Sequence, residues 1–163
     1  MFLKSNYLII SLFLSLILSC TTKNITNEEI YGTLDIPKIN LEATIYNKES
    51  EYNQLKYGLY LLPESSSLDN KNSHIIIASH SGTAKISHFK NLDQLELNDE
   101  IKIIIKKEIY LFKVINIYEE EKDGIIDINK YNTKTLSLIT CKKNTNDLQI
   151  IISAVYTGKL EKI

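Results

Sequence analysis

The residue best suited to chemistry in this sequence is Cys141. It follows the apolar, β-prone run at 135–140 and precedes a polar segment, which predicts a strand that delivers one thiol to the start of a loop. The only other cysteine is Cys20, for which the N-terminal pattern predicts another role. A solitary thiol in an exported protein calls for an explanation other than a disulfide. Nucleophilic catalysis by the thiolate is the leading one.

Three histidines are candidates for the proton-transfer partner of this thiol. His80 follows the β-branched run 75–79 and precedes a Ser-Gly pair, a strand exit at which a side chain is held but accessible. His74 opens the same run, about 20 Å away in an extended strand, so it cannot share a site with His80. His88 is predicted on the surface of a short helix. The residues favour His80, but they do not show that its strand end meets that of Cys141.

The first twenty residues have the layout of an export signal. Lys4 is followed by the segment 7–18, which is apolar apart from serines and is short for a membrane span of about 20 residues. The tetrad Ile-Leu-Ser-Cys at 17–20 resembles a lipobox, the cleavage signal of bacterial lipoproteins, and this resemblance implies that Cys20 is lipidated. The alternative is an uncleaved N-terminal anchor at 1–20. Both predict that the rest of the chain lies outside the cytoplasmic membrane.

The remaining sequence predicts a polar tether at 21–30 and one domain at 31–163, a size typical of single domains. The formal net charge is −1 with acids and bases interspersed, which does not favour nucleic acid as a partner. We interpret the acidic run 119–123 as a solvated loop between strands. Its spacing does not predict calcium, and the histidines and cysteines do not predict zinc, so we expect neither a metal nor a cofactor.

Short β-branched runs separated by turn residues dominate the domain. They predict strands at 32–36, 43–46, 74–79, 100–106, 108–118, 135–140 and 149–155, with a hairpin turn near Lys106 and Lys107. Seven or eight such strands predict a mainly β protein, a mostly antiparallel barrel or sandwich. Short helices are expected at 86–91 and 130–133, with a weaker candidate at 53–57.

Several segments, in order, resemble the sortase family of cysteine transpeptidases over nearly everything from Tyr31 to Tyr156. YGTLDIPKIN at 31–40 is similar to the opening sortase strand, LKYG at 55–58 to the approach to the histidine strand, and IIIASHSG at 75–82 to the histidine motif. LITC at 138–141 matches the L-x-T-C motif of the nucleophile. The segment 89–99 is similar to the family's F-x-x-L-x-x-L-x-x-G-D pattern, with matches at Phe89, Leu92, Leu95 and Asp99 and with Asn98 in place of the glycine.

This resemblance implies an eight-stranded sortase-like β-barrel with short helices. It places Cys141 in the nucleophile position and His80 in the general acid/base position, so that an amide is exchanged through a thioester. The implied partners are exported proteins bearing a C-terminal sorting signal and an amine acceptor, either a cell-wall precursor or a pilin lysine. The implied location is the extracytoplasmic face of the bacterial cell membrane, lipid- or helix-anchored. A lipobox departs from a family normally held by a transmembrane helix.

A second departure concerns the family's third catalytic residue, an arginine at the start of the strand after the cysteine. The chain contains no arginine, and alignment of the strand at 150–154 puts Gln149 in that position. Its amide can donate a hydrogen bond to an oxyanion, but it lacks positive charge and the guanidinium fork. Two alternatives stay open: Lys142 or Lys143 supplies the charge, or Gln149 is a strand residue without a catalytic task.

The missing arginine also keeps two other functions open. One is a degenerate sortase-like barrel that binds a peptide or cell-wall component without catalysis, although a binding module has no chemical need for both His80 and Cys141. The other is a thiol protease, in which water resolves the thioester. Product analysis with and without an added amine distinguishes hydrolysis from transfer.

Overall fold

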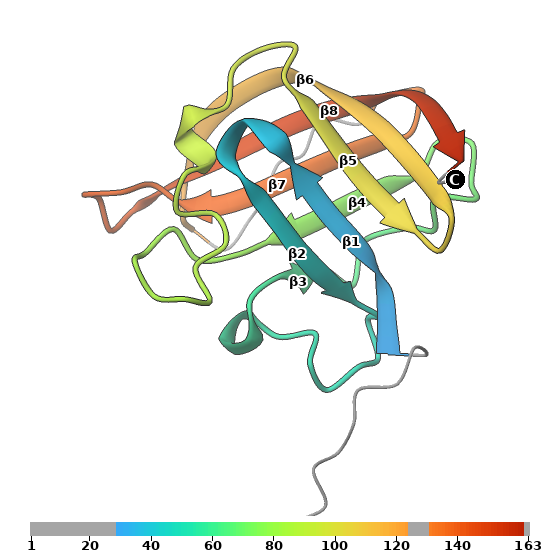
Figure 1. Cartoon of the computed structure of the whole chain (residues 1–163). Coiled ribbons are helices and arrows are strands. Elements are labelled where there is room, and N and C mark those ends of the chain that lie inside the picture. Colours follow the sequence, from blue (N-terminus) through green and yellow to red (C-terminus); the bar gives the residue numbers. More distant parts are fainter. Residues whose placement is uncertain (1–28, 124–130, 162–163) are drawn as a thin grey trace, which may run out of the picture.

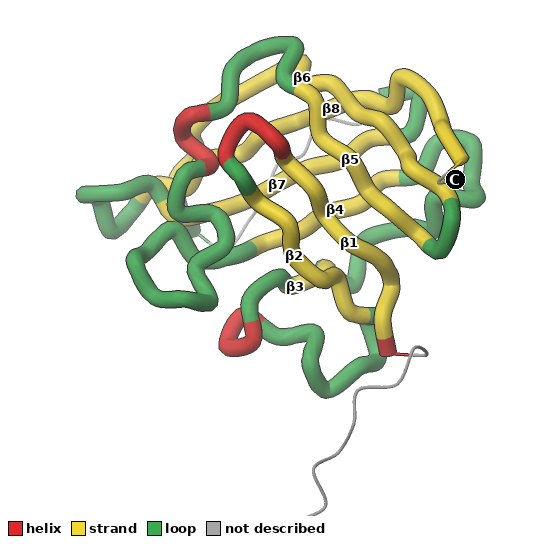
Figure 2. The backbone as a smooth tube through the Cα atoms, in the orientation of Figure 1, coloured by secondary structure: helices red, strands yellow, loops and turns green. Residues whose placement is uncertain are grey.

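The structure is a computed structural model that describes residues 29–123 and 131–161. Strands are its main secondary structure and helices are short (Figures 1 and 2). The strands are β1 (Ile30–Ile36), β2 (Leu41–Tyr46), β3 (Tyr60–Leu61), β4 (His74–Ala78), β5 (Glu100–Ile105), β6 (Glu108–Glu121), β7 (Thr135–Cys141) and β8 (Leu148–Glu161). The short 3-10 helices include η2 (Pro37–Ile39), η3 (Leu55–Tyr57) and η4 (Leu92–Gln94). The predicted mainly β, eight-stranded barrel is confirmed, and β3 is the strand that the sequence pattern missed.

The strands form one sheet in the order β2-β1-β5-β6-β8-β7-β4-β3, which curls into a nearly closed barrel because β2 and β3 come next to one another (Figure 1). Neighbouring strands pair antiparallel except for β4 and β7, which run parallel. Parallel strands end at the same edge of a sheet. The residues that follow β4 and β7 are therefore brought to one end of the barrel.

The barrel interior is filled by one face of each strand, with fully buried side chains such as Leu34, Ile77, Phe112 and Leu138. Strand β7 departs from simple alternation, since every residue from 135 to 140 is buried. Its outer face packs in a second cluster made of Ile76, Ile139 and Ile151. Burial on both faces fits a strand built only of apolar and small hydroxyl side chains before Cys141.

Strand β6 is longer than predicted. It reaches Glu121 because β8 pairs with it to the end, with Glu119 opposite Ile150 and Glu120 opposite Gln149. The prediction of a solvated loop at 119–123 is therefore wrong for its first three residues. Pairing with an apolar neighbour overrides the weak β-propensity of glutamate.

The connection from β4 to β5 also differs from the prediction. Residues 86–91 form turns instead of a helix, and η4 begins only at Leu92. His88 is half-buried instead of lying on a helix surface, with its ring so close to Gly58 that a Cβ added there would lie 2.6 Å from Nε2. The candidate helix at 53–57 is present as η3. Residues 131–133 are not helical, and 130 lies outside the described residues.

Residues of the F-x-x-L-x-x-L-x-x-G-D pattern hold this connection against the barrel. Phe89, Leu92 and Leu95 are all buried in the main core. Asn98 stands where the pattern has glycine and adopts φ 73, a left-handed conformation that asparagine tolerates better than most residues.

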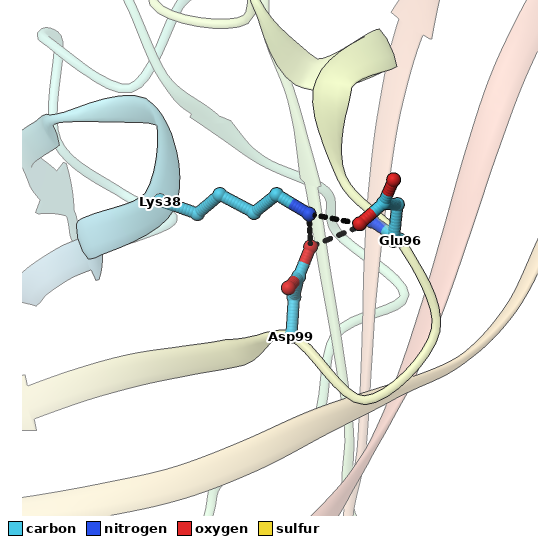
Figure 3. Close-up of polar contacts among 3 residues, drawn as sticks. All are labelled: Lys38, Glu96 and Asp99. Carbon is cyan, nitrogen blue, oxygen red and sulfur yellow. Dashed lines mark hydrogen bonds and ion pairs between the residues drawn. The ribbon is translucent and has the colours of Figure 1, made fainter.

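An ion-pair cluster ties the connection to η2 (Figure 3). Lys38 Nζ lies 2.6 Å from Glu96 Oε2 and 2.8 Å from Asp99 Oδ2. The Glu96 backbone N–H also donates to Asp99 Oδ2 at 2.6 Å. The hydrogen bonds that Lys38 donates to Asp99 and Glu96 hold its pKa above the ordinary value.

Candidate active site

The parallel pairing of β4 and β7 brings His80 and Cys141 to neighbouring positions. Ala78 lies opposite Ile139 at the end of the paired region. Just beyond it, the Ser79 N–H donates to the Ile139 carbonyl at 3.2 Å. His80 and Cys141 each stand two residues past the pair of Ala78 and Ile139, and parallel strands end at the same edge of a sheet. Figure 1 shows β4 and β7 side by side. The structure thus brings together the two strand ends that sequence spacing alone left unconnected.

Buried hydrogen bonds fix these strand ends. Thr140 Oγ1 donates to the Ser79 carbonyl at 2.8 Å, which joins the residues immediately before Cys141 and His80. Ser79 Oγ donates to the Gly58 carbonyl at 3.0 Å, and the Phe89 N–H donates to the His80 carbonyl at 3.2 Å. A catalytic pair needs such support, because small errors in position lower the rate strongly.

Both candidate groups belong to the outer face of the barrel. Alternation along the strand places Cys141 on the face of Ile139, a member of the outer cluster. The Cys141 thiol is free and its residue is partly exposed, and His80 is exposed. A peptide can therefore approach this pair from outside the barrel.

Gln149 lies directly opposite Cys141 in the pairing of β7 and β8. It also lies opposite Glu120 in the pairing of β6 and β8. Residues in register on adjacent strands share a face, with Cβ atoms about 5 Å apart when directly opposite. Cys141, Gln149 and Glu120 thus form a row across three strands. Gln149 is only 7% exposed, and one carboxylate oxygen of Glu120 is buried without a hydrogen-bond partner.

The lysines nearest in sequence to Cys141 are directed to carboxylates. Lys142 Nζ lies 2.6 Å from Glu119 Oε2, and Lys143 Nζ lies 3.0 Å from Asp93 Oδ2. A different lysine reaches the thiol: Lys122 Nζ donates to Cys141 Sγ at 3.2 Å. No local pattern indicated this contact, because residues 122 and 141 come together only through the pairing of β6 and β7 with β8.

The other histidines lie away from this end of the barrel or take part in packing. His74 begins β4, at the end opposite His80, and its Nε2 lies 2.8 Å from Ser137 Oγ. Burial lowers the pKa of His88, whose ring packs beside Gly58. His80 is thus the histidine at the strand end next to Cys141.

An accessible thiol and histidine at neighbouring strand ends make this a candidate thiol enzyme built on a β-barrel. The chain matches the family model of the sortase domain over residues 34–157, and it belongs to the sortase family. The predicted family is confirmed. Sortase membership implies cysteine transpeptidase chemistry in general terms.

Solved structures of sortases share this fold. Sortase C1 from Streptococcus agalactiae is 25% identical, with a TM-score of 0.71 over 83% of this chain and 71% of that chain. Sortase C from Streptococcus pneumoniae is 22% identical, with a TM-score of 0.72 over 85% of this chain and 73% of that chain. Sortase E1 from Streptomyces coelicolor, solved with a tripeptide in its active site, is 17% identical, with a TM-score of 0.67 over 85% and 94%. A search of curated proteins finds no match.

Two further observations concern the described residues alone. Within 29–123 and 131–161, no helix has the length and apolar character to cross a membrane. The same residues contain no cluster of three or more histidine, cysteine, aspartate or glutamate side chains suited to a metal ion. Cys20 and the predicted export signal lie outside the described residues.

Proposed function

We propose that this chain is a membrane-attached sortase-type cysteine transpeptidase. It cleaves a C-terminal sorting signal on another exported protein through a thioester on Cys141 and transfers the acyl part to an amine. The observation that carries this proposal is the parallel register of β4 and β7, which brings His80 and Cys141 to one accessible end of a sortase barrel.

The proposed reaction has two halves. The Cys141 thiolate attacks the scissile carbonyl, and the carbonyl π electrons move to oxygen. When the tetrahedral intermediate collapses, the C–N bond breaks and the His80 imidazolium protonates the departing amine. The incoming amine then attacks the thioester while neutral His80 accepts its proton, and the C–S bond breaks to regenerate the thiolate.

We assign Gln149 the stabilisation of the oxyanion. Its position opposite Cys141 supports this role, since an amide donor beside the nucleophile can reach a developing negative charge. A neutral donor forms a weaker hydrogen bond to an anion than a guanidinium does. We therefore expect a slower enzyme than an arginine at this position would allow.

The proposed substrates are exported proteins with a sorting signal, and the acceptor is a cell-wall precursor or a pilin lysine. Support comes from the family match and from the similarity to a sortase C whose structure was analysed for pilin substrate specificity. The proposed location is the extracytoplasmic face of the membrane. Attachment is through residues 1–20, by lipidation of Cys20 or by an uncleaved anchor.

Intact mass spectrometry of the full-length protein with a pool of sorting-signal peptides tests this function. We expect a thioester adduct that disappears in Cys141→Ala, while the fold remains intact. His80→Ala should lower turnover by at least about 100-fold, because the leaving amine loses its proton donor.

The products distinguish the alternatives. Added amine should convert the thioester to an amide, whereas a protease would release the acid whether or not amine is present. An adduct that persists in Cys141→Ala, or normal turnover in His80→Ala, would overturn the assigned roles. Peptide binding without any adduct would support the non-catalytic barrel.

A further inference from the structure

We infer that Lys122 supplies the positive charge that holds Cys141 as a thiolate. This inference rests on the proposed transpeptidase function, because the thiolate is the species that attacks. Lys122 Nζ lies 3.2 Å from Cys141 Sγ. An ammonium carries three donors and no acceptor, so it favours an anionic sulfur over a neutral thiol.

The backbone of Lys122 is fixed in the sheet next to the thiol. Its N–H donates to the Asp147 carbonyl at 2.7 Å, which extends the pairing of β6 with β8 by one residue. On the other side of β8, the Lys142 N–H donates to the Leu148 carbonyl at 2.9 Å. The chain segments that carry Lys122 and Cys141 are thus bound to two adjacent residues, Asp147 and Leu148, where β8 begins.

The neighbouring lysines do not compete for this role. Lys142 and Lys143 form ion pairs with Glu119 and Asp93. Among the described carboxylates, none forms an ion pair with Lys122. Since the chain contains no arginine, a permanent cation at the thiol has to be a lysine.

A cation at this face also offsets a nearby negative charge. Glu120 stands in the same row as Cys141 and has a buried oxygen without a partner. A thiolate and a carboxylate two strands apart, about 10 Å, repel one another. Lys122 comes two residues after Glu120 and contacts the sulfur directly, so its charge offsets this repulsion where the nucleophile forms.

In the reaction, Lys122 donates hydrogen bonds but transfers no proton. The ammonium stays protonated while Sγ forms its bond to the carbonyl carbon. When the thioester forms, the sulfur loses its charge and the contact weakens. It strengthens again when the acceptor amine displaces the sulfur, which makes the thiolate a better leaving group.

Paired alkylating reagents test the charge without any substrate. The full-length protein and its Lys122→Gln variant are treated at pH 7 and low salt with iodoacetamide, which is neutral, and with iodoacetate, which is an anion. We expect Lys122→Gln to lower the iodoacetamide rate at Cys141 about tenfold and the iodoacetate rate further, because an anion is attracted by the ammonium. Added salt should reduce the preference for iodoacetate in the parent protein.

Matched variants separate this charge effect from a change in structure. Lys122→Arg should restore most of the alkylation rate and the iodoacetate preference, and Lys142→Gln and Lys143→Gln should leave both near the parent values. An unchanged ratio of the two reagent rates in Lys122→Gln would overturn the inference. An equal effect of Lys142→Gln would also overturn it, because the charge would then not be specific to residue 122.

The alkylation result can be interpreted independently of the peptide-acylation test of the proposed function. A loss of iodoacetate preference in Lys122→Gln supports the charge role even if no sorting-signal peptide acylates Cys141. If peptides do acylate Cys141 and the ratio is unchanged, the transpeptidase proposal stands and the role of Lys122 fails.

Discussion

At the residue scale, two side chains share the task that we assign to the catalytic arginine of the family, a residue absent from this chain. Lys122 brings a charge to the sulfur, and Gln149 brings a hydrogen-bond donor to the position opposite Cys141. A guanidinium supplies charge and directed donors from one group, whereas a lysine is a point charge on a flexible stem. The two-residue arrangement therefore supplies the charge from the end of β6 and the donor from β8.

Substitution of Gln149 by arginine tests its position. We expect Gln149→Arg to raise the rate of thioester formation several-fold, because a charge-assisted hydrogen bond is about twice as strong as a neutral one. The buried oxygen of Glu120, on the opposite strand, offers the new cation a partner. The measurement is the rate of adduct formation by rapid quench and intact mass.

Gln149→Met is the matched control, since it keeps the size of the side chain and removes the donor. It should lower the same rate several-fold. A lower rate in Gln149→Arg, together with an unaffected Gln149→Met, would mean that the oxyanion is stabilised elsewhere.

At the element scale, the site depends on the contact between β4 and β7. These strands lie side by side in parallel, and Thr140 Oγ1 closes their shared end with a buried hydrogen bond to the Ser79 carbonyl. Each of these two residues directly precedes a proposed catalytic group. The strand ends, rather than a flexible loop, therefore set the separation of His80 and Cys141.

Thr140→Val should loosen this end. The substitution keeps the shape and leaves the buried Ser79 carbonyl without that donor, so we expect unfolding free energy to fall by about 1–3 kcal/mol. Thioester formation should fall more than alkylation of Cys141, because only the former needs His80 in position. Urea unfolding and adduct kinetics measure the two effects.

Thr44 provides the control for this experiment. It is exposed on β2, and Thr44→Val should change stability by no more than about 0.5 kcal/mol. Equal losses in the two variants would show that the Thr140 hydrogen bond has no special role.

At the scale of the whole molecule, one barrel core supports both the site and the connection from β4 to β5. Buried Phe89 and Leu92 anchor that connection, and Lys38 ties it to η2 (Figure 3). His88 lies within the same connection and packs beside Gly58. Protonation of this half-buried ring should therefore affect the stability of the whole fold.

The sign of this pH effect follows from the pKa of His88, which burial lowers from its ordinary value of 6.5. The unfolded chain then binds the proton more readily than the folded one, so unfolding free energy is largest above pH 6.5. It falls as the pH decreases through 6.5 toward the folded pKa. His88→Gln should remove this part of the acid sensitivity.

Urea denaturation at pH 7.5 and pH 5.5 measures the effect. We expect the parent protein to lose more stability between these two pH values than His88→Gln does. Equal losses would show that the ring of His88 is protonated as easily in the folded state as in the unfolded chain.

Several features followed from local sequence. β-branched runs identified seven of the strands because such side chains suit a pleated, half-buried backbone. The same patterns placed Cys141 and His80 at strand ends, and ordered motifs identified the family. Strand β3 was missed because a two-residue strand carries almost no pattern. The full length of β6 was missed because its glutamates are extended only through their pairing with β8.

Local sequence by itself thus determined seven of the eight strands, the mainly β class and the candidate pair of thiol and imidazole, and the family motifs indicated the barrel. Only the tertiary structure decided that β4 and β7 pair in parallel, that Glu120 and Gln149 share a row with Cys141, and that Lys122 rather than Lys142 or Lys143 reaches the sulfur. The physical reason is that strand formation depends on neighbours along the chain. Strand pairing and the reach of a long side chain depend on residues far away in sequence, which folding brings within a few ångströms.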